Sequence, residues 1–153
     1  MRGIPAMFFN GSQNAIVGSG SESHSYQDYK EKVDSELAKK SHLKIEASMS
    51  VANNKVAING LVTNTGQEPI SNVRVMLVVY EDLAKSERHH VVRDMLPSQS
   101  IPSLAPGATQ SFSAVSDELL ADNMSKVKAI VFIQSVDLPQ REILQAVLAT
   151  QES

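Results

Sequence analysis

This chain of 153 residues has four histidines, and its carboxylates are spread along the sequence. These are the side chains best suited to bind a metal ion or to transfer protons. His89 and His90 form the only adjacent histidine pair. Neighbours on a strand point to opposite faces, so these two imidazoles cannot bind one metal ion unless a bulge intervenes. We interpret them as half-exposed polar residues of an edge strand and predict no metal site.

Five carboxylates stand close to expected strand ends and turns, where they could supply oxygen ligands. They are Glu81, Asp82, Asp117, Glu118 and Asp122. Their spacing lacks the alternating Asp/Asn pattern of an EF-hand calcium loop. Turn polarity and the preference for acidic residues at a helix N-terminus explain them more simply.

The chain contains no cysteine, which excludes disulfides, thiolate metal sites and cysteine nucleophiles. Its serines lie in Gly/Ser-rich stretches, without a Gly-x-Ser-x-Gly elbow, and no glycine-rich phosphate loop precedes a helix. We therefore predict that this chain is not an enzyme and binds no cofactor.

The net charge of −3 is mild, and no Lys/Arg cluster forms a phosphate-tracking patch, so we expect no nucleic-acid partner. No stretch approaches the roughly 20 apolar residues of a membrane span, and no signal-peptide pattern is present. Either the chain is cytosolic or, as we favour, it is a fragment whose targeting sequence lay upstream in an extracellular or periplasmic protein.

Residues 1–40 have the pattern of a β-hairpin followed by a helix. The apolar run 4–9 ends at Asn10-Gly11, a dipeptide suited to the positive φ angles of a tight hairpin turn, and 15–17 would be the return strand. From about Ser25 the pattern becomes helical. The apolar residues that recur there at spacings of three and four are Tyr26, Tyr29, Val33 and Leu37.

This first segment resembles the last third of a thioredoxin fold, on Arg2-Gly3-Ile4-Pro5, the apolar strand and Asn10-Gly11. The resemblance implies that Pro5 matches the cis-proline beside the active-site cysteines, where it helps to receive an extended peptide. The Cys-x-x-Cys motif is absent, and without a thiolate there is no nucleophile for disulfide exchange. An ordinary hairpin and helix is the alternative interpretation.

From Ser41 onward the apolar pattern changes to a period of two, which indicates strands with one buried face. Seven strands are expected, over residues 43–51, 55–64, 72–80, 89–95, 109–114, 127–134 and 142–148. The third is apolar on both faces and is the best candidate for a central strand. Residues 116–124 look like one helical turn with Ser116 as N-cap, and 142–148 suits a helix by propensity, although we favour a strand.

Seven short strands with regular turn signals predict a mainly β chain whose residues 41–153 form an immunoglobulin-like β-sandwich. The residues resemble bacterial modules of the FxLYD and CARDB families, on Gly60-Leu61-Val62-Thr63-Asn64, the strand running to Tyr80, Pro106-Gly107 and Phe112. This resemblance implies a fold more than a function. The order of the two parts is similar to bacterial exported proteins of the Omp28-like group.

A hairpin and helix of about 40 residues is too small to bury its own apolar face. It must dock on the sandwich, pair with a second copy, or stay partly disordered. We expect partner-strand or peptide contact at the open edge formed by Pro5, Ala6, Met7, Phe8 and Phe9. The predicted function is a non-catalytic interaction module that binds a protein or its own copy. The alternative is an accessory fragment of a thiol-disulfide oxidoreductase.

Overall fold

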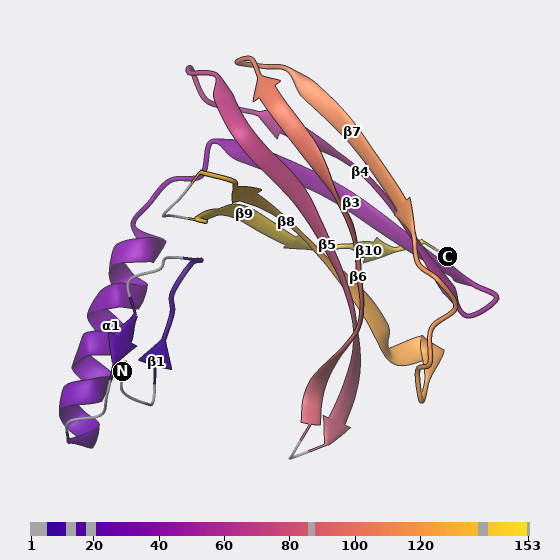
Figure 1. The fold of residues 1–153 in the computed structure, drawn as a ribbon, viewed down its shortest axis with the longest axis horizontal. Helices are drawn as coiled ribbons and strands as arrows, with labels where there is room; N and C mark the ends of the chain where they lie inside the picture. The colour runs from indigo at the N-terminus through magenta and orange to yellow at the C-terminus, as the bar shows by residue number, and fades with distance from the viewer. Residues whose placement is uncertain (1–5, 12–14, 18–20, 86–87, 138–140, 153) are drawn as a thin grey trace.

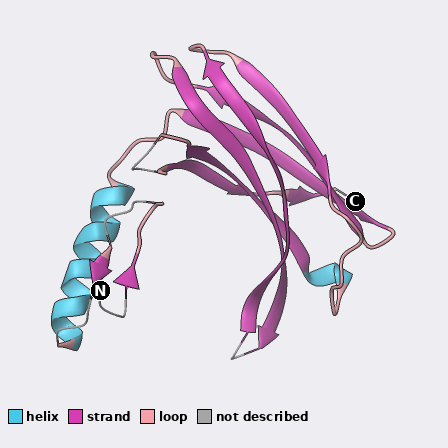
Figure 2. Cartoon of the chain, in the orientation of Figure 1, coloured by secondary structure: helices cyan, strands magenta, loops and turns pink. Residues whose placement is uncertain are grey.

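The computed structural model describes residues 6–11, 15–17, 21–85, 88–137 and 141–152 (Figure 1). Two four-stranded sheets form a sandwich, and a small hairpin with one helix lies beside it (Figure 2). In chain order the elements are β1 (Ala6–Met7), β2 (Ile16–Val17), α1 (Glu22–Leu37), β3 (Leu43–Ala52), β4 (Lys55–Asn64), β5 (Ile70–Lys85), β6 (Arg88–Leu104), β7 (Thr109–Val115), the 3-10 helix η1 (Met124–Lys126), β8 (Val127–Ser135), β9 (Ile143–Leu148) and β10 (Thr150–Gln151).

The two sheets have the strand orders β10-β3-β4-β7 and β6-β5-β8-β9, and the core lies between them. The seven expected strands correspond to β3–β9, so the predicted mainly β sandwich is confirmed, including the strand over the last segment. An eighth strand, β10, pairs in parallel with β3. Its two residues are too few to leave a periodic pattern in the sequence.

The strand β5 is central, as predicted, because it pairs with β6 on one side and β8 on the other. β5 and β6 are much longer than expected and form an extended hairpin (Figure 1). Register shifts along their pairing break the simple alternation from which strand ends were predicted. β6 also contains Pro97 and Pro102, which an edge strand tolerates because one side of its backbone has no partner.

The prediction of a helical turn over residues 116–124 is wrong. Among the described residues after β7, the helical ones are those of η1, which begins only at Met124. Ser116 does not cap a helix. It is buried, and its hydroxyl accepts a hydrogen bond from the backbone N–H of Val56 at 2.9 Å. Its backbone N–H donates to the carbonyl of Val56, so the chain leaves β7 still held against β4.

Asn and Gly residues hold the turns between the strands of the sandwich. Asn53 and Asn54, at the β3–β4 turn, both have positive φ angles. The side-chain amide of Asn64 donates to the carbonyls of Glu68 and Leu104 and so ties together the loop that follows β4. Gly107 has a φ angle of 74°. These polar residues fix the turns between strands and leave the core to aliphatic side chains.

β1 and β2 pair through Ala6–Val17 and Met7–Ile16. Asn10 and Gly11 form a turn with the positive φ angles that we expected, 50° and 71°, and residues 12–14, which follow it, lie outside the described residues. The helix begins at Glu22, before the expected Ser25, because the Ser21 hydroxyl caps it by accepting the backbone N–H of His24. No helix of the described residues is long and apolar enough to cross a membrane.

Candidate interaction surface on the hairpin and helix

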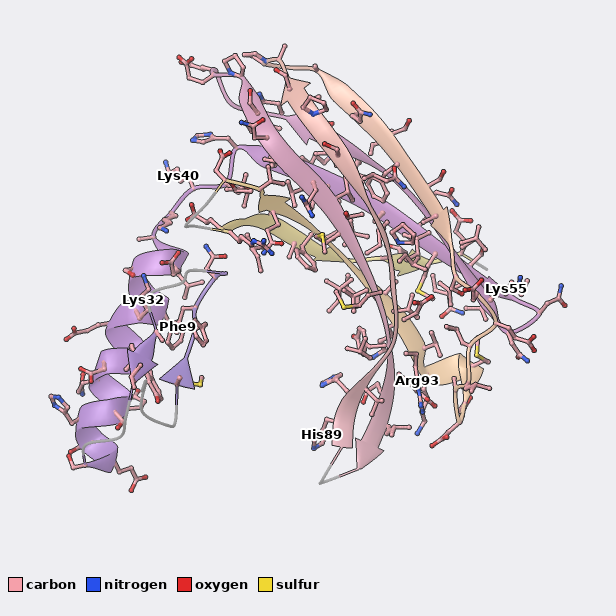
Figure 3. The ribbon with its side chains drawn as sticks, in the orientation of Figure 1. Phe9, Lys32, Lys40, Lys55, His89 and Arg93 are labelled. Carbon is pink, nitrogen blue, oxygen red and sulfur yellow. The ribbon has the colours of Figure 1, made fainter. Side chains whose placement is uncertain are left out.

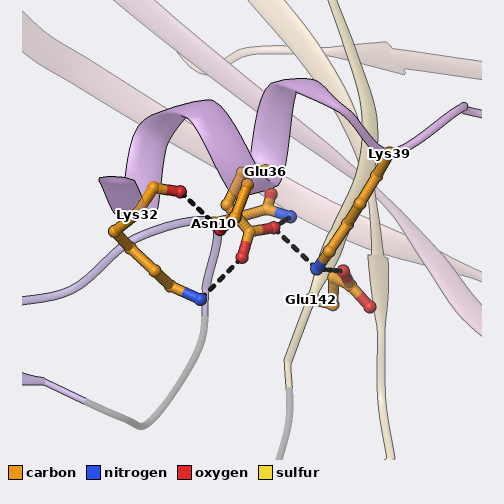
Figure 4. A network of polar contacts seen from close by, with 6 residues as sticks. Asn10, Lys32, Glu36, Lys39 and Glu142 are labelled. Atoms are coloured by element: carbon orange, nitrogen blue, oxygen red, sulfur yellow. Dashed lines mark hydrogen bonds and ion pairs between the residues drawn. The ribbon is translucent and has the colours of Figure 1, made fainter. Parts of the chain in front are cut away.

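We call β1, β2, α1 and the residues between them that the structure describes the hairpin–helix segment. A polar network joins this segment to the start of β9 (Figure 4). The carboxylate of Glu36 accepts hydrogen bonds from Lys32 at 2.8 Å and from the side-chain amide of Asn10 at 3.0 Å. Lys39 forms ion pairs with Glu36 at 2.7 Å and with Glu142 at 2.6 Å. The segment is thus tied to the sandwich through charges.

The hydrogen bonds from Lys32 and then Lys39 lower the pKa of Glu36 to about 2, against its ordinary value of 4.5. The hydrogen bonds to Glu142 and Glu36 raise the pKa of Lys39 above 10.5. Each group therefore holds its charge across the neutral range. The network is intact wherever both the carboxylates and the ammonium groups are ionised.

The turn at Asn10 and Gly11 also makes a backbone contact with this edge of the sandwich. The carbonyl of Asn10 accepts the N–H of Ile143 at 3.3 Å. A Cβ atom at Gly11 would lie 2.0 Å from the carbonyl oxygen of Arg141, so no other residue fits this approach without displacing backbone. The Asn-Gly turn therefore also positions the segment on β9.

The apolar side of the segment stays largely uncovered. None of the described residues of α1 is buried. Leu37 is 77% exposed and Phe8 is 56% exposed, and Met7, Val17, Tyr26 and Val33 are exposed as well. The ring of Phe9 packs against Tyr29, with 5.8 Å between the ring centroids (Figure 3). Of the three outcomes that we considered, docking occurs, but through polar groups at one edge.

The residues predicted for strand or peptide contact have different surroundings. Ala6 and Met7 form β1 and are exposed, and Phe8 is exposed beyond it. Phe9 is half-buried against α1. Pro5, on which the comparison with a thioredoxin cis-proline depends, lies outside the described residues. The role of this stretch as a peptide-binding edge stays a prediction.

A hollow of about 660 Å³ lies between α1 and β9. Its apolar lining includes Phe9, Val33, Leu37, Ile143 and Ala146, and Glu36, Lys39 and Glu142 also line it. Aliphatic and aromatic walls beside a few charged groups suit a partly apolar protein segment. The sequence signalled Phe9, Val33 and Leu37 as an unburied face, but not that β9 would be opposite.

The histidines and carboxylates singled out in the sequence do not come together as a site. His89 and His90 are both exposed, and within the described residues no group of three or more His, Asp or Glu side chains could hold a metal ion. The His90 ring lies edge-on to Tyr80, with 5.3 Å between centroids. Asp82 pairs with Lys128.

Glu81 is the most deeply buried charge among these carboxylates, with no exposed surface. Its carboxylate accepts hydrogen bonds from Arg93 at 2.6 Å and from the backbone N–H groups of Asp122 and Asn123. Burial raises the pKa of Glu81, but these donors outweigh it and leave that pKa below 4.5. Through these hydrogen bonds Glu81 holds the loop before η1 against β5.

No protein family model matches this chain, and no curated protein matches it. Solved structures do. A domain of the outer membrane lipoprotein Omp28 from Porphyromonas gingivalis matches with a TM-score of 0.53 and 13% identity, over 74% of this chain and 92% of that one. At this identity the likeness is one of fold. It supports the resemblance to Omp28-like proteins at that level, while membership of the FxLYD or CARDB families and the thioredoxin-like origin stay predictions.

Two enzymes contain regions that match with lower TM-scores. The alkylpurine DNA glycosylase AlkC of Pseudomonas fluorescens gives a TM-score of 0.41 at 16% identity, over 74% of this chain and 31% of the glycosylase. The β-glucosidase EmGH1 of Erythrobacter marinus gives 0.43 at 17% identity, over 73% of this chain and 16% of the glucosidase. The chain spans less than a third of either enzyme, and neither likeness bears on its activity.

Proposed function

We propose that this chain is a non-catalytic β-sandwich module, an accessory part of a bacterial exported protein, that associates with a protein partner or with its own copy through the hairpin–helix segment. The observation that carries the proposal is the uncovered apolar side of that segment, beside a sandwich whose core is complete without it. Soluble proteins rarely leave such a surface contiguous and exposed unless it binds something.

The sandwich has the character of a scaffold. The core cluster is drawn from Leu43 to Ala149, and the buried charge of Glu81 has its hydrogen-bond partners within the sandwich. The fold likeness to a domain of an outer membrane lipoprotein supports an extracellular or periplasmic parent protein. In this proposal the rigid sandwich presents the less stable hairpin–helix segment to a partner.

The test is removal of residues 1–40, followed by measurement of mass in solution over a range of concentrations. Because the described core residues begin at Leu43, the truncated chain should fold alone and melt close to the full chain. We expect the full chain to self-associate, or to bind a protein partner, and the truncated chain to do neither. A truncated chain that keeps the same oligomeric state and the same partner would overturn the proposal.

A further inference from the structure

The outer face of the β6-β5-β8-β9 sheet is unusually apolar for a surface turned away from the core. On β5, Val73, Val75, Leu77 and Val79 belong to the core cluster. Alternation along a strand puts Met76 and Val78 on the opposite face. The same holds for β8, where Val131 and Ile133 are buried in the core and the alternating residues point outward.

The strand register joins these outward residues into rows across the sheet. Val78 lies opposite Met95 on β6 and Ile130 on β8, and Ile130 lies opposite Leu148 on β9. In the next row Met76 lies opposite Phe132. We call this set the outer apolar face, and its residues are Met76, Val78, Met95, Ile130, Phe132 and Leu148.

The side of an antiparallel sheet that faces water normally carries polar residues. Here Met95 is 60% exposed and Leu148 is 52% exposed, on the two edge strands. Polar groups bound the face, with Arg74 opposite Gln134 at one end and the Asp82–Lys128 ion pair at the other. An apolar centre with a polar rim is the usual composition of a protein–protein interface.

We infer that the outer apolar face receives the hairpin–helix segment of a second copy of this chain, an inference that rests on the proposed function. The chain itself has two apolar surfaces that its described residues leave uncovered, the outer apolar face and the exposed side of the hairpin–helix segment. Their charges differ in sign: α1 carries five acidic residues against Lys30 and Lys32, whereas Arg74 lies at one end of the sheet face and Lys128, at the other end, is paired with Asp82.

The hairpin–helix segment of the same chain does not cover the outer apolar face. Its contacts with Arg141, Glu142 and Ile143 tie it to the beginning of β9, and only residues 38–42 connect α1 to β3 (Figure 1). Figure 3 shows Phe9 to one side of the sandwich. The segment of a second copy has no such short connection to the sheet that receives it. Reciprocal exchange then gives two identical contacts related by a two-fold axis, the commonest arrangement of homodimers.

The first experiment places two charges on the outer apolar face of the full chain, by Met95→Glu combined with Leu148→Glu. The matched control is Val115→Glu with Leu120→Glu, two side chains that are 62% and 90% exposed and lie outside this face. We expect the face variant to weaken dimerisation at least tenfold, measured by sedimentation, and the control to leave it within about twofold. Thermal unfolding should be similar for both variants.

The second experiment uses the absence of cysteine from the chain. Phe8→Cys and Leu148→Cys chains, carrying different isotope labels, are mixed and treated with a short bis-maleimide. We expect products that join residue 8 of one copy to residue 148 of the other. Predominant 148-to-148 products would mean that two sheet faces pair with each other and would overturn the inference. A chain with both substitutions that links within itself as a dilute monomer would also overturn it.

The outcomes separate this inference from the proposed function. If removal of residues 1–40 abolishes the dimer while the face variant keeps it, the proposed function stands and the outer apolar face is the wrong receiving surface. If the full chain is monomeric, or if neither change affects its self-association, the inference is wrong, and the proposed function then stands only if residues 1–40 are needed to bind a different protein. Loss of the dimer in both variants, together with 8-to-148 products, supports the inference.

Discussion

The sandwich and the hairpin–helix segment are held together by different forces. The sandwich buries a continuous set of aliphatic side chains between two sheets and surrounds its buried charge, Glu81, with donors. No described residue of α1 is buried, and the segment is attached through the Lys39–Glu142 ion pair and the hydrogen bond from the Ile143 N–H to the Asn10 carbonyl. Burial of apolar area dominates folding, and partly exposed ion pairs contribute little.

This difference indicates that the two regions have different tasks. The core of the sandwich lies within residues 43–149, so we expect changes to its buried residues to lower stability. The attachments of the segment are polar, so we expect it to separate from β9 without unfolding the rest and to offer its apolar side chains to a partner. Four predictions test this division, beginning with the largest effect.

The sharpest comparison is between one buried and one exposed leucine. Leu77 is 1% exposed in the sandwich core, and Leu37 is 77% exposed on α1. Leu77→Ala should lower the free energy of unfolding by about 3 kcal/mol because it leaves a cavity. Leu37→Ala should change it by less than about 0.5 kcal/mol. Urea unfolding measures both, and a comparable loss from Leu37→Ala would show that the segment is part of the cooperative fold.

The next comparison concerns buried and exposed charge. Arg93→Met removes the side-chain donor of Glu81 and leaves a carboxylate without exposed surface and without its cation. We expect a loss of about 3 kcal/mol, as for other buried ion pairs with one partner removed. The control is Lys44→Met, since Lys44 and Glu46 form an exposed pair whose loss should stay below about 1 kcal/mol. Equal losses in denaturant melts would show that burial does not decide how much an ion pair contributes, and would remove the reason to expect weak attachment by the exposed Lys39–Glu142 pair.

A smaller effect is expected at two glycines of the sandwich. A Cβ at Gly60 would lie 2.2 Å from the carbonyl oxygen of Glu46 and 2.3 Å from the ring of Phe112, so Gly60→Ala should destabilise by about 2 kcal/mol through overpacking. A Cβ at Gly107 would have no atom within 4 Å, so Gly107→Ala is opposed only by the positive φ of this residue. We expect it to lower the free energy of unfolding by about 1 kcal/mol. A crystal structure and melting curves of both variants would sharpen the comparison. Reversal of the two losses would refute it.

The smallest effect is the response of the segment to acid. The hydrogen bonds from Lys32, Lys39 and Asn10 lower the pKa of Glu36 to about 2, against 4.5 in its ordinary state, so the segment with this network intact binds fewer protons. The contribution of Glu36 to holding Asn10 in place is fully present above about pH 4.5 and is lost as the pH falls toward 2. We expect the hydrogen-exchange protection factor of the Ile143 amide, which donates to Asn10, to fall between pH 5.5 and pH 2.5.

Two controls locate this acid response. Glu36→Gln should remove the pH dependence at Ile143 because the titrating group is gone. The amide of Ala149, which donates to the carbonyl of Ala129 inside the sandwich, should lose less protection over the same range. Equal loss at the two amides would mean that acid acts on the whole fold and would contradict a separate segment.

Local pattern was enough to predict most of the sandwich. The alternation in residues 43–51 and in the doubly apolar β5 follows from burial of one or both faces, a property that each strand carries in its own residues. Strand ends in β5 and β6 were not predictable in this way. Their pairing shifts register, and that depends on the partner strand.

The turn at Asn10 and Gly11 shows the same limit. These residues have a strong preference for positive φ, and the structure has that conformation. The strand that the turn contacts could not be predicted from the dipeptide, because it depends on what lies opposite, here Arg141 and Ile143. Ser116 likewise has the chemistry of a helix cap, yet its hydroxyl accepts a hydrogen bond from Val56, far away in the sequence.

By itself the sequence determined the period-two strands, the turn residues, the absence of cysteine chemistry and the apolar face of residues 1–40, which is too small to bury itself. These are local or compositional properties. Only the tertiary structure decided which donors surround Glu81, that β9 carries the hairpin–helix segment, and that outward residues of four strands align into one apolar face. These features depend on register and on contacts between distant residues, which no single stretch of the chain contains.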